Sequence, residues 1–405
     1  MISRIFIPIL LAIVLPDLYF DQHYWRSRYH GRWWLRLLWW LPGMLMFIYT
    51  IALVSIRDFV PADLTWINVY MFLVGLIVWP KAIFALCSGL GLLWSRWRHS
   101  RVNLGNIVAV VLILINWYVL IYGSTIGTKE LTVQRNDLYF TNLPERFDGY
   151  RIVFFSDAHV GSFTGARRTL LQRDIDSINA QRADLIAFGG DLQNIRPQEI
   201  VPVMPLLRQL RARDGVVSVL GNHDYSEYTH DRPDVEAANC RLVIDLQRRM
   251  GWKLLLNSHF ALHRSGDSIV VAGEQNFRKP DSCNFSRTMN GVGEKAFVVM
   301  LQHDPRAWDD HIVPSHRVAL TLSGHTHGGQ IAFFGVSPVR LVYAEDDGLY
   351  QRDGSMMCVS AGIGGLVFFR FGVPPEINVI TLHRIKHELI ERRSHSYEKN
   401  LVLSL

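Results

Sequence analysis

Long apolar stretches in the first third of the chain constrain its fold more than any other feature. Residues 5–20, 37–56, 66–93 and 104–126 are apolar and nearly free of charge. About 20 apolar residues in a helix span the hydrocarbon core of a bilayer, so we expect four transmembrane helices. The first stretch is the weakest, because it is short, contains Pro8 and Pro16 and ends at Asp17. A cleaved signal peptide is the alternative there, although no small-x-small cleavage site stands out.

The distribution of charge agrees with a membrane domain joined to a neutral globular one. The first 126 residues hold 10 Lys and Arg against 4 Asp and Glu, and the rest of the chain holds the remaining 32 of each sign. All of the net charge of +6 therefore lies in the apolar third and gives no reason to expect nucleic-acid binding. The sequence predicts an integral protein of a bacterial inner or plasma membrane, and it leaves the oligomeric state open.

The arginines of the first third predict the orientation of the helices. They gather in the loop after the first stretch and the loop before the fourth, at Arg26, Arg28, Arg32, Arg36, Arg96, Arg98 and Arg101. The positive-inside rule places both of these loops in the cytoplasm. Three spans separate the first loop from the globular part, so we expect the globular part on the extracytoplasmic side.

Lys81 interrupts the third apolar stretch directly after Pro80. An ionisable residue within a membrane span is a functional-site hypothesis by default, and it leaves open a transport role for the helices. The favoured interpretation is a kinked helix whose lysine reaches toward an interface with its ammonium group.

From residue 151 the sequence alternates between short β-branched runs and amphipathic stretches, which is typical of an α/β domain. Strands are expected at 151–156, 184–188, 216–220, 296–301 and 318–322. Helices are expected at 166–182 and 197–215. The predicted organisation is a membrane domain at 1–126, a lead-in strand and connector at 127–150, a globular domain at 151–385 and a tail at 386–405.

Each of the five expected strands runs directly into a polar cluster. In chain order the clusters are Ser156-Asp157-Ala158-His159, Gly189-Gly190-Asp191, Gly221-Asn222-His223-Asp224, Gln302-His303-Asp304 and Gly324-His325-Thr326-His327. Ligand sites in α/β sheets lie beyond the carboxyl ends of the strands, and all five clusters are at such ends.

The residue types in these clusters suit metal ions and phosphate chemistry. Asp191 can bridge two cations, Asn222 offers a carbonyl oxygen, and the histidines offer imidazoles. Mixed nitrogen and oxygen ligands favour Mn, Fe, Zn or related ions over Ca or Mg alone. Two such ions about 3.5–4 Å apart can clamp a phosphate and generate a hydroxide for in-line attack. The glycines before Asp191, Asn222 and His325 permit close approach of the backbone to the ions.

The motif order DxH, GGD, GNHD, HD and GHTH resembles that of the calcineurin-like metallophosphoesterase family, in its membrane-anchored bacterial type. The resemblance covers about residues 128–384, including SGHTHGGQ at 323–330 and a glycine-rich stretch at 361–365. It implies a four-layer αββα sandwich that binds two divalent ions. By residue, it implies a first ion held by Asp157, His159, Asp191 and His327, and a second held by Asp191, Asn222, His303 and His325.

The resemblance also implies that His223 contacts the phosphate or protonates the leaving oxygen, with Asp224 orienting it. No ligand position is substituted. One departure is local: Gln193 and Asn194 follow Asp191, where related sequences often have a hydrophobic residue and Asp or Thr.

Three further residues are candidates for substrate contact. Arg167 could touch a phosphate, although a solvated first helical turn is the simpler interpretation. His230 lies in a polar loop after the GNHD motif and could rim the site. Phe368 lies in the apolar, glycine-containing stretch 364–375 and could receive an acyl chain, with core packing as the alternative.

The sequence therefore predicts a membrane-anchored, metal-dependent hydrolase of phosphate mono- or diesters outside the cytoplasm. A membrane lipid or lipid-linked phosphate is the expected substrate, because the globular domain follows the last apolar stretch closely. Two alternatives stay open: a membrane protein that senses phosphate without turnover, and a transport role for the helices with Lys81 at its centre.

Overall fold

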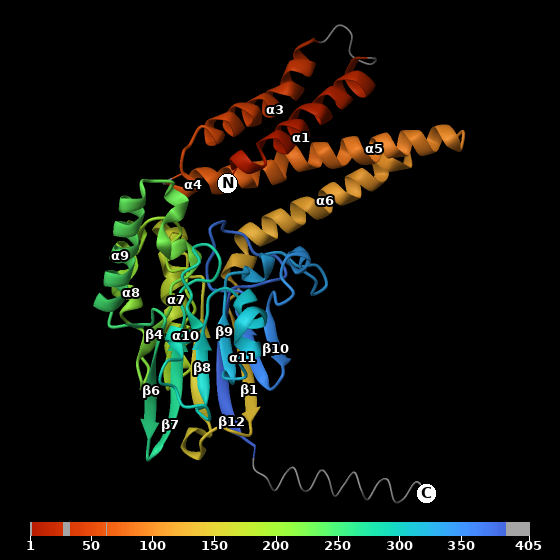
Figure 1. Cartoon of the computed structure of the whole chain (residues 1–405). Coiled ribbons are helices and arrows are strands. Elements are labelled where there is room, and N and C mark those ends of the chain that lie inside the picture. The colour runs from red at the N-terminus through yellow and green to blue at the C-terminus, as the bar shows by residue number, and fades with distance from the viewer. Residues whose placement is uncertain (1, 27–32, 62, 386–405) are drawn as a thin grey trace, which may run out of the picture. The chain divides into compact units, whose positions relative to one another are not determined.

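The computed structural model of the chain describes residues 2–26, 33–61 and 63–385. It divides into two units (Figure 1). One unit contains Met1–Lys129 together with two short segments, Glu227–Arg232 and Leu366–Phe371, and the other contains the rest of the chain. The tail expected at 386–405 and two of the loop arginines, Arg28 and Arg32, lie outside the described residues.

The first unit is built from long apolar helices. Among the described residues, four helical stretches are long and apolar enough to cross a membrane: Phe6–Trp25, Trp33–Val54, Leu64–Trp97 and Leu104–Lys129. They comprise α1 (Phe6–Phe20), α3 (Trp33–Val54), α4 (Leu64–Leu73), α5 (Trp79–Trp97) and α6 (Leu104–Thr125). The π-helical turns Asp21–Trp25 and Val74–Val78 extend α1 and join α4 to α5. The predicted transmembrane helices are confirmed.

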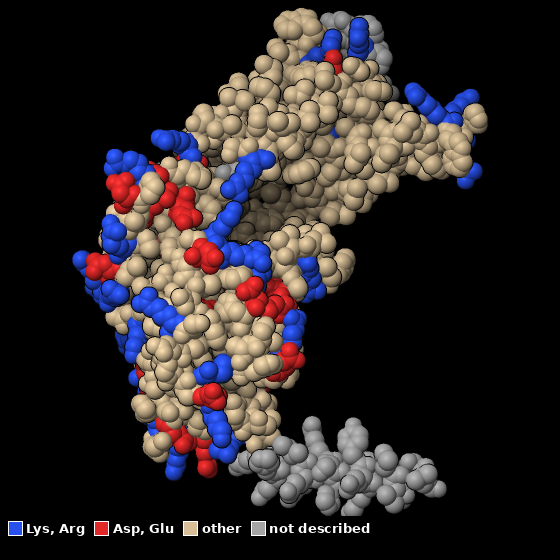
Figure 2. Space-filling view, viewed as in Figure 1, with Lys and Arg blue, Asp and Glu red and all other residues tan. Residues whose placement is uncertain are grey.

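Two of these helices begin at a polar side chain. The carboxylate of Asp63 accepts a hydrogen bond from the N–H of Thr65 at the start of α4, and Asn103 accepts one from Gly105 at the start of α6. Such caps satisfy backbone donors that have no partner within the helix. On the face shown in Figure 2, charged side chains are scattered over the second unit, whereas the helices carry them mainly near their ends.

Two six-stranded sheets form the middle of the second unit. The first sheet has the order β1-β12-β2-β3-β4-β5, with β1 Thr132–Phe140, β12 Glu376–Arg384, β2 Tyr150–Phe155, β3 Leu185–Phe188, β4 Val216–Ser218 and β5 Lys253–Leu254. Strands β2 to β5 are parallel, and β12 runs antiparallel to β2.

The second sheet has the order β10-β11-β9-β8-β7-β6, with β10 Gly348–Arg352, β11 Ser355–Val359, β9 Leu320–Ser323, β8 Val298–Leu301, β7 Asp267–Gly273 and β6 Ser258–Arg264. Its four central strands are parallel, and the two edge strands are antiparallel to their neighbours.

Alternate residues of the strands pack on opposite sides of each sheet. On β2, Ile152 and Phe154 join the core between the sheets, while Val153 and Phe155 face the helices that cover the first sheet. These helices are α7 Arg168–Ala180, α8 Met204–Leu207 and α9 Pro233–Arg249. A third cluster around the buried Trp308 covers the outer face of the second sheet, with α10 Phe285–Thr288 and α11 Val313–Ser315. The result is the expected four-layer αββα sandwich.

The helix expected at 197–215 is instead a series of short pieces. The turns Pro197–Glu199 and Val201–Val203 precede α8. Pro202 and Pro205 have no N–H to donate, and their rings crowd the preceding turn, so a continuous α-helix is interrupted at both residues. The apolar face is buried as the sequence pattern indicates, because Ile200 and Leu207 belong to the core on the first sheet.

Candidate metal centre

The five polar clusters follow the carboxyl ends of β2, β3 and β4 in the first sheet and of β8 and β9 in the second. Three groups of their side chains place potential ligand atoms within 4.8 Å of one another: Asp157, His159 and His327; His159, Asp191 and His223; and Asp191, His303 and His325. The structure thus brings the predicted ligands together, and Asp191 belongs to two of the three groups.

Around Asp157, the ligand atoms have the spacing that one shared ion requires. The Nε2 atom of His327 lies 3.4 Å from Oδ1 of Asp157, and Nε2 of His159 lies 3.6 Å from Oδ2 of Asp191. Two ligand atoms that are each about 2.0–2.2 Å from one ion lie roughly 3–3.6 Å apart, depending on the angle at the ion. The residues present therefore fit a first divalent ion at this position.

The fit to a second ion rests on His303. Its Nδ1 donates to the carbonyl oxygen of Gly189 at 2.7 Å, which leaves the lone pair of Nε2 available. This buried Nε2 lies 3.3 Å from Oδ2 of Asp191 and has no hydrogen-bond partner within the described part of the chain. Close by, Nδ1 of His325 lies 2.8 Å from Oδ1 of Asn222. A cation shared by these atoms would satisfy the buried nitrogen.

The electrostatics of the cluster favour a bound cation. Burial raises the pKa of Asp157 to about 6. Burial also disfavours the charge on Asp191, but His303 and His223 outweigh it and hold the pKa of Asp191 well below its usual range. Although burial opposes a charge on His303, Asp191 and Asp157 raise the pKa of His303 to about 10. The carboxylates thus attract positive charge, which a divalent ion would supply in place of the proton on His303.

The backbone at the cluster is held in an unusual conformation. Five predicted ligands have φ in the left-handed region: Asp157 at 50°, His159 at 42°, Asp191 at 59°, His325 at 73° and His327 at 53°. Non-glycine residues in this region cost of order 1–3 kcal/mol each and concentrate at functional sites. Other turns of the chain contain such residues too, but here five of them are ligand candidates, whose conformation the surrounding structure must hold in place.

Two glycines allow the close packing of the ligand loops. A Cβ atom on Gly221 would lie 2.2 Å from Oδ1 of Asp191, and one on Gly324 would lie 2.3 Å from Oδ2 of Asp157. Neither position tolerates a side chain without displacing a carboxylate. The glycines of the GNHD and GHTH motifs are therefore required by geometry.

The ring of His223 is oriented by a backbone carbonyl. Its Nδ1 lies 2.5 Å from the carbonyl oxygen of Asn194, so Nδ1 carries a proton and donates it in a hydrogen bond to that oxygen. The carboxylate of Asp224 accepts hydrogen bonds from the backbone N–H groups of Gly221, Asp191 and Leu192. Asp224 therefore binds the backbone of both loops, and its role in orienting His223, which the resemblance implies, stays a prediction.

Some residues that hydrogen-bond to the cluster lie outside the five sequence motifs. The hydroxyl of Tyr343 lies 2.8 Å from Nε2 of His325, which turns Nδ1 toward Asn222. The side-chain amide of Gln193 donates to the carbonyl of His223 at 2.8 Å. Gln193 and Asn194 depart from the family pattern, so the sequence could have indicated that this loop supports His223. Nothing in the sequence around Tyr343 indicates its role.

The three substrate candidates lie outside the ligand groups. Arg167 ends a 3-10 turn before α7, and partial burial lowers the pKa of its guanidinium. His230 is exposed, in the segment that groups with the helices. Phe368 also belongs to the helical unit, where its N–H donates to the side-chain oxygen of Asn68 at 2.8 Å. Contact of any of the three with a substrate stays a prediction.

Both parts of the chain match known protein families. Residues 3–128 match the family described as "Probable Calcineurin-like phosphoesterase, transmembrane domain", and residues 150–329 match "Calcineurin-like phosphoesterase". Among solved structures, a dimetal phosphatase from Danio rerio aligns over 53% of this chain and 88% of its own, at 12% identity and a TM-score of 0.32.

Relatives with similar sequences occur in bacteria and in animals. The uncharacterized metallophosphoesterase YkuE of Bacillus subtilis is 32% identical over 248 residues, which cover 59% of this chain and 81% of YkuE. A transmembrane protein with metallophosphoesterase domain from Danio rerio is 31% identical over 261 residues, which cover 62% of this chain and 57% of that protein. The chain therefore belongs to the calcineurin-like metallophosphoesterase family, as an integral membrane protein that hydrolyses phosphate esters with the help of divalent metal ions.

Proposed function

We propose that this phosphoesterase uses two divalent ions to hydrolyse the phosphate ester of a membrane lipid or lipid-linked substrate on the extracytoplasmic side. Asp157, His159, Asp191 and His327 would hold one ion, and Asp191, Asn222, His303 and His325 the other. Asp191 belongs to two ligand groups, which supports two metal ions rather than one. The many imidazole ligands support Mn, Fe or Zn as the metal. When bound, the ions would act as Lewis acids on the phosphate and supply an activated water.

The residues of the chain itself would position the substrate and move a proton. Because Nδ1 of His223 keeps its own proton on the carbonyl of Asn194, the ring would act as a general acid in its imidazolium form. That form would give its second proton, on Nε2, to the leaving oxygen and leave a neutral imidazole. Asp224 keeps the loops of Asp191 and His223 in register through backbone hydrogen bonds. A proton donor for the leaving oxygen is needed only if the ester bond is broken, so the position of His223 supports hydrolysis over phosphate sensing without turnover.

The observation that carries the lipid assignment is an exposed apolar segment that begins six residues after the GHTH motif. In the segment 333–342, Phe334 is fully exposed and Leu341 and Val342 are 90% and 71% exposed. The next residue, Tyr343, is hydrogen-bonded to His325. Soluble proteins rarely expose many large apolar side chains together, and such patches mark membrane or protein contacts. A lipid surface or an acyl chain beside the metal ligands would cover these side chains.

A second feature of the chain supports the same substrate class. Gly362 lies against the side chain of Asp157, and Gly364 lies against the backbone of Ala158, where a Cβ atom on Gly364 would be 2.0 Å from the carbonyl oxygen. From Gly365 the chain continues directly into Leu366–Phe371, which belongs to the helical unit. The segment that contains Phe368 thus follows, along the chain, directly after the glycine-rich loop that packs against Asp157.

The lipid substrate predicts a dependence of activity on acyl-chain length. We expect kcat/KM of the wild type to rise along a series of phospholipid-like esters, by up to about fourfold for each buried CH₂, which is worth about 0.8 kcal/mol. Phe334→Ser and Phe368→Ser should flatten the trend without changing turnover of a short water-soluble ester. The matched control is Val201→Ser, because Val201 is an exposed apolar residue in the turn before α8. Equal turnover of long and short esters by the wild type would leave a phosphoesterase without lipid preference.

The arginine distribution predicts the side of the membrane on which the metal cluster lies. In intact cells, a membrane-impermeant thiol reagent should label Gln134→Cys, on the exposed side of β1, and should not label Ser100→Cys, in the exposed loop between α5 and α6. Labelling after detergent lysis shows that both cysteines can react. The opposite pattern would place the phosphoesterase domain in the cytoplasm.

A further inference from the structure

Lys81 forms an ion pair within the helical unit. Its Nζ lies 2.7 Å from Oδ1 of Asp17 on α1, donates to the carbonyl of Trp39 at 3.3 Å and lies 4.7 Å from the ring centroid of Trp39. The side chains of Lys81 and Asp17 are only 12% and 1% exposed. The structure thus differs from the interpretation in which Lys81 reaches toward an interface, because its charge is balanced among the helices.

The two oxygens of Asp17 have different surroundings. Oδ1 accepts from Lys81, whereas the buried Oδ2 has no hydrogen-bond partner in the described part of the chain. The neighbouring ion pair is different, because both carboxylate oxygens of Asp21 accept from Arg36, at 2.6 and 2.5 Å. Buried acceptors are nearly always paired. The indole N–H of Trp39 lies near this carboxylate, but within the described residues neither Oδ2 of Asp17 nor Nε1 of Trp39 makes a hydrogen bond of ordinary geometry.

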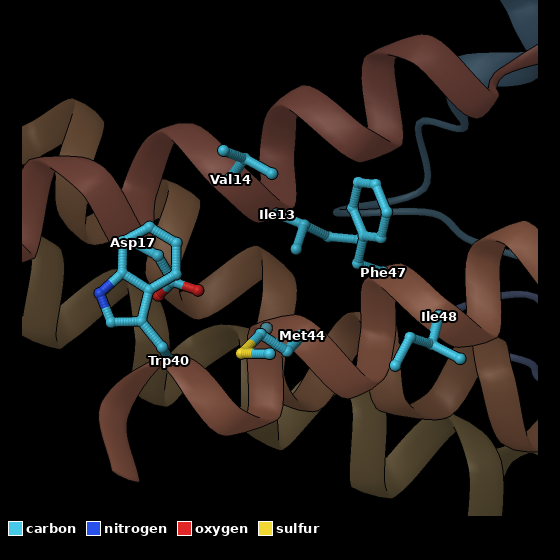
Figure 3. Close-up of a pocket in the computed structure, with 8 residues that line it drawn as sticks. Ile13, Val14, Asp17, Trp40, Met44, Phe47 and Ile48 are labelled. Carbon is cyan, nitrogen blue, oxygen red and sulfur yellow. The ribbon is translucent and has the colours of Figure 1, made fainter. Parts of the chain in front are cut away.

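Asp17 lines a cavity of about 150 Å³ between α1 and α3. Figure 3 shows its carboxylate directed toward the side chains of Trp40 and Met44. Gly43 leaves room for the carboxylate, since a Cβ atom there would lie 2.1 Å from Oδ2. Met44 and Ile48, also in the cavity wall, are 49% and 62% exposed, so the cavity is within reach of lipid chains that surround the helices.

We propose that this cavity binds a membrane lipid with a hydroxyl head, a long-chain primary alcohol, whose O–H donates to Oδ2 of Asp17. A carboxylate oxygen only accepts, so the ligand must bring a donor. The ion pair with Lys81 is already neutral, so an ammonium or an anion would add an uncompensated charge inside the membrane, whereas a hydroxyl adds none. The other lining residues are without formal charge, which suits a carbon chain.

The size of the cavity agrees with such a ligand. An apolar cavity of about 150 Å³ holds a molecule the size of benzene. The hydroxyl and the first carbons would therefore fill it, and the rest of the chain would run along the exposed side chains of Met44 and Ile48. Hydrolysis of a lipid phosphate monoester would release an alcohol of this kind, but the site is inferred from the helices alone and does not rest on that substrate.

The test uses the full chain in lipid nanodiscs and a hexadecanol probe that carries a diazirine close to its hydroxyl. After photolysis, mass spectrometry should find the label on peptides of α1 and α3. Unlabelled hexadecanol should compete with the probe. Hexadecyl methyl ether, which has the same chain but no donor, should compete at least about tenfold more weakly, as expected for the loss of a hydrogen bond to a charged acceptor. Equal competition by the ether, or label spread evenly over the helices, would overturn the proposal.

Three variants separate the hydrogen bond from the cavity itself. Asp17→Asn presents an amide that can donate to either ligand, so the difference between alcohol and ether should disappear. Val14→Phe fills the cavity while the Asp17–Lys81 pair stays in place, and should abolish specific labelling. Asp21→Asn removes the neighbouring carboxylate and should behave as wild type. Unchanged discrimination in Asp17→Asn contradicts the proposal, and thermal unfolding of each variant in nanodiscs reports whether the helices are intact.

Discussion

Replacing Asp191 with Asn is expected to leave neither ion properly placed and to lower kcat below about 1% of the wild-type value. Oδ2 of Asp191 lies 3.3 Å from Nε2 of His303 and 3.6 Å from Nε2 of His159, so one atom serves both ligand groups. A neutral amide cannot offset the repulsion between two cations as a bridging carboxylate does. Elemental analysis of the purified protein and turnover of an aryl phosphate with added Mn are the measurements.

A matched control for this variant is Asp174→Asn. Asp174 is also a buried carboxylate, on α7, where burial raises its pKa to about 6 and its partner is Arg173. It lies outside the three ligand groups, so its loss should change thermal stability and leave metal content and kcat close to wild type. An Asp191→Asn protein that retains both ions and full activity would show that the bridging role is wrong.

The second large effect is expected for His223→Ala, which should keep its metal while kcat falls about 10²–10⁴-fold. His223 belongs to one ligand group, but its Nδ1 is held by Asn194 and its Nε2 is assigned to the leaving oxygen. The loss should therefore depend on the leaving group. It should be large for an alkyl phosphate, whose alkoxide needs a proton, and small for a nitrophenyl phosphate, whose phenolate does not.

The control for His223→Ala is His316→Ala, which removes an exposed histidine outside the ligand groups. It should match the wild type with both substrates. If His223→Ala purifies without metal, His223 is a ligand and not a general acid. An equal loss for the two leaving groups would instead indicate that His223 contacts the phosphate without transferring a proton.

Local patterns in the sequence determined the architecture and the composition of the metal cluster. The apolar stretches predicted the four helices, because the rise of a helix per residue and the thickness of the hydrocarbon core fix how many residues a span needs. Strands that end in Asp157, Asp191 and Asn222 predicted a cluster, since parallel strands bring their carboxyl ends to one edge. The same local reasoning was wrong for the helix at 197–215, where the apolar period was given more weight than Pro202 and Pro205.

The tertiary structure alone decided which partners these residues have. Lys81 and Asp17 are 64 residues apart and pair only because α5 packs beside α1. The carbonyl of Asn194 orients His223, and Tyr343 turns His325, although neither contact has a sequence motif. Periodicity and spacing report on neighbours along the chain, whereas a hydrogen bond between distant residues depends on how whole elements pack. The sequence therefore determined which residues can form the candidate metal cluster, and only packing determined how they are held.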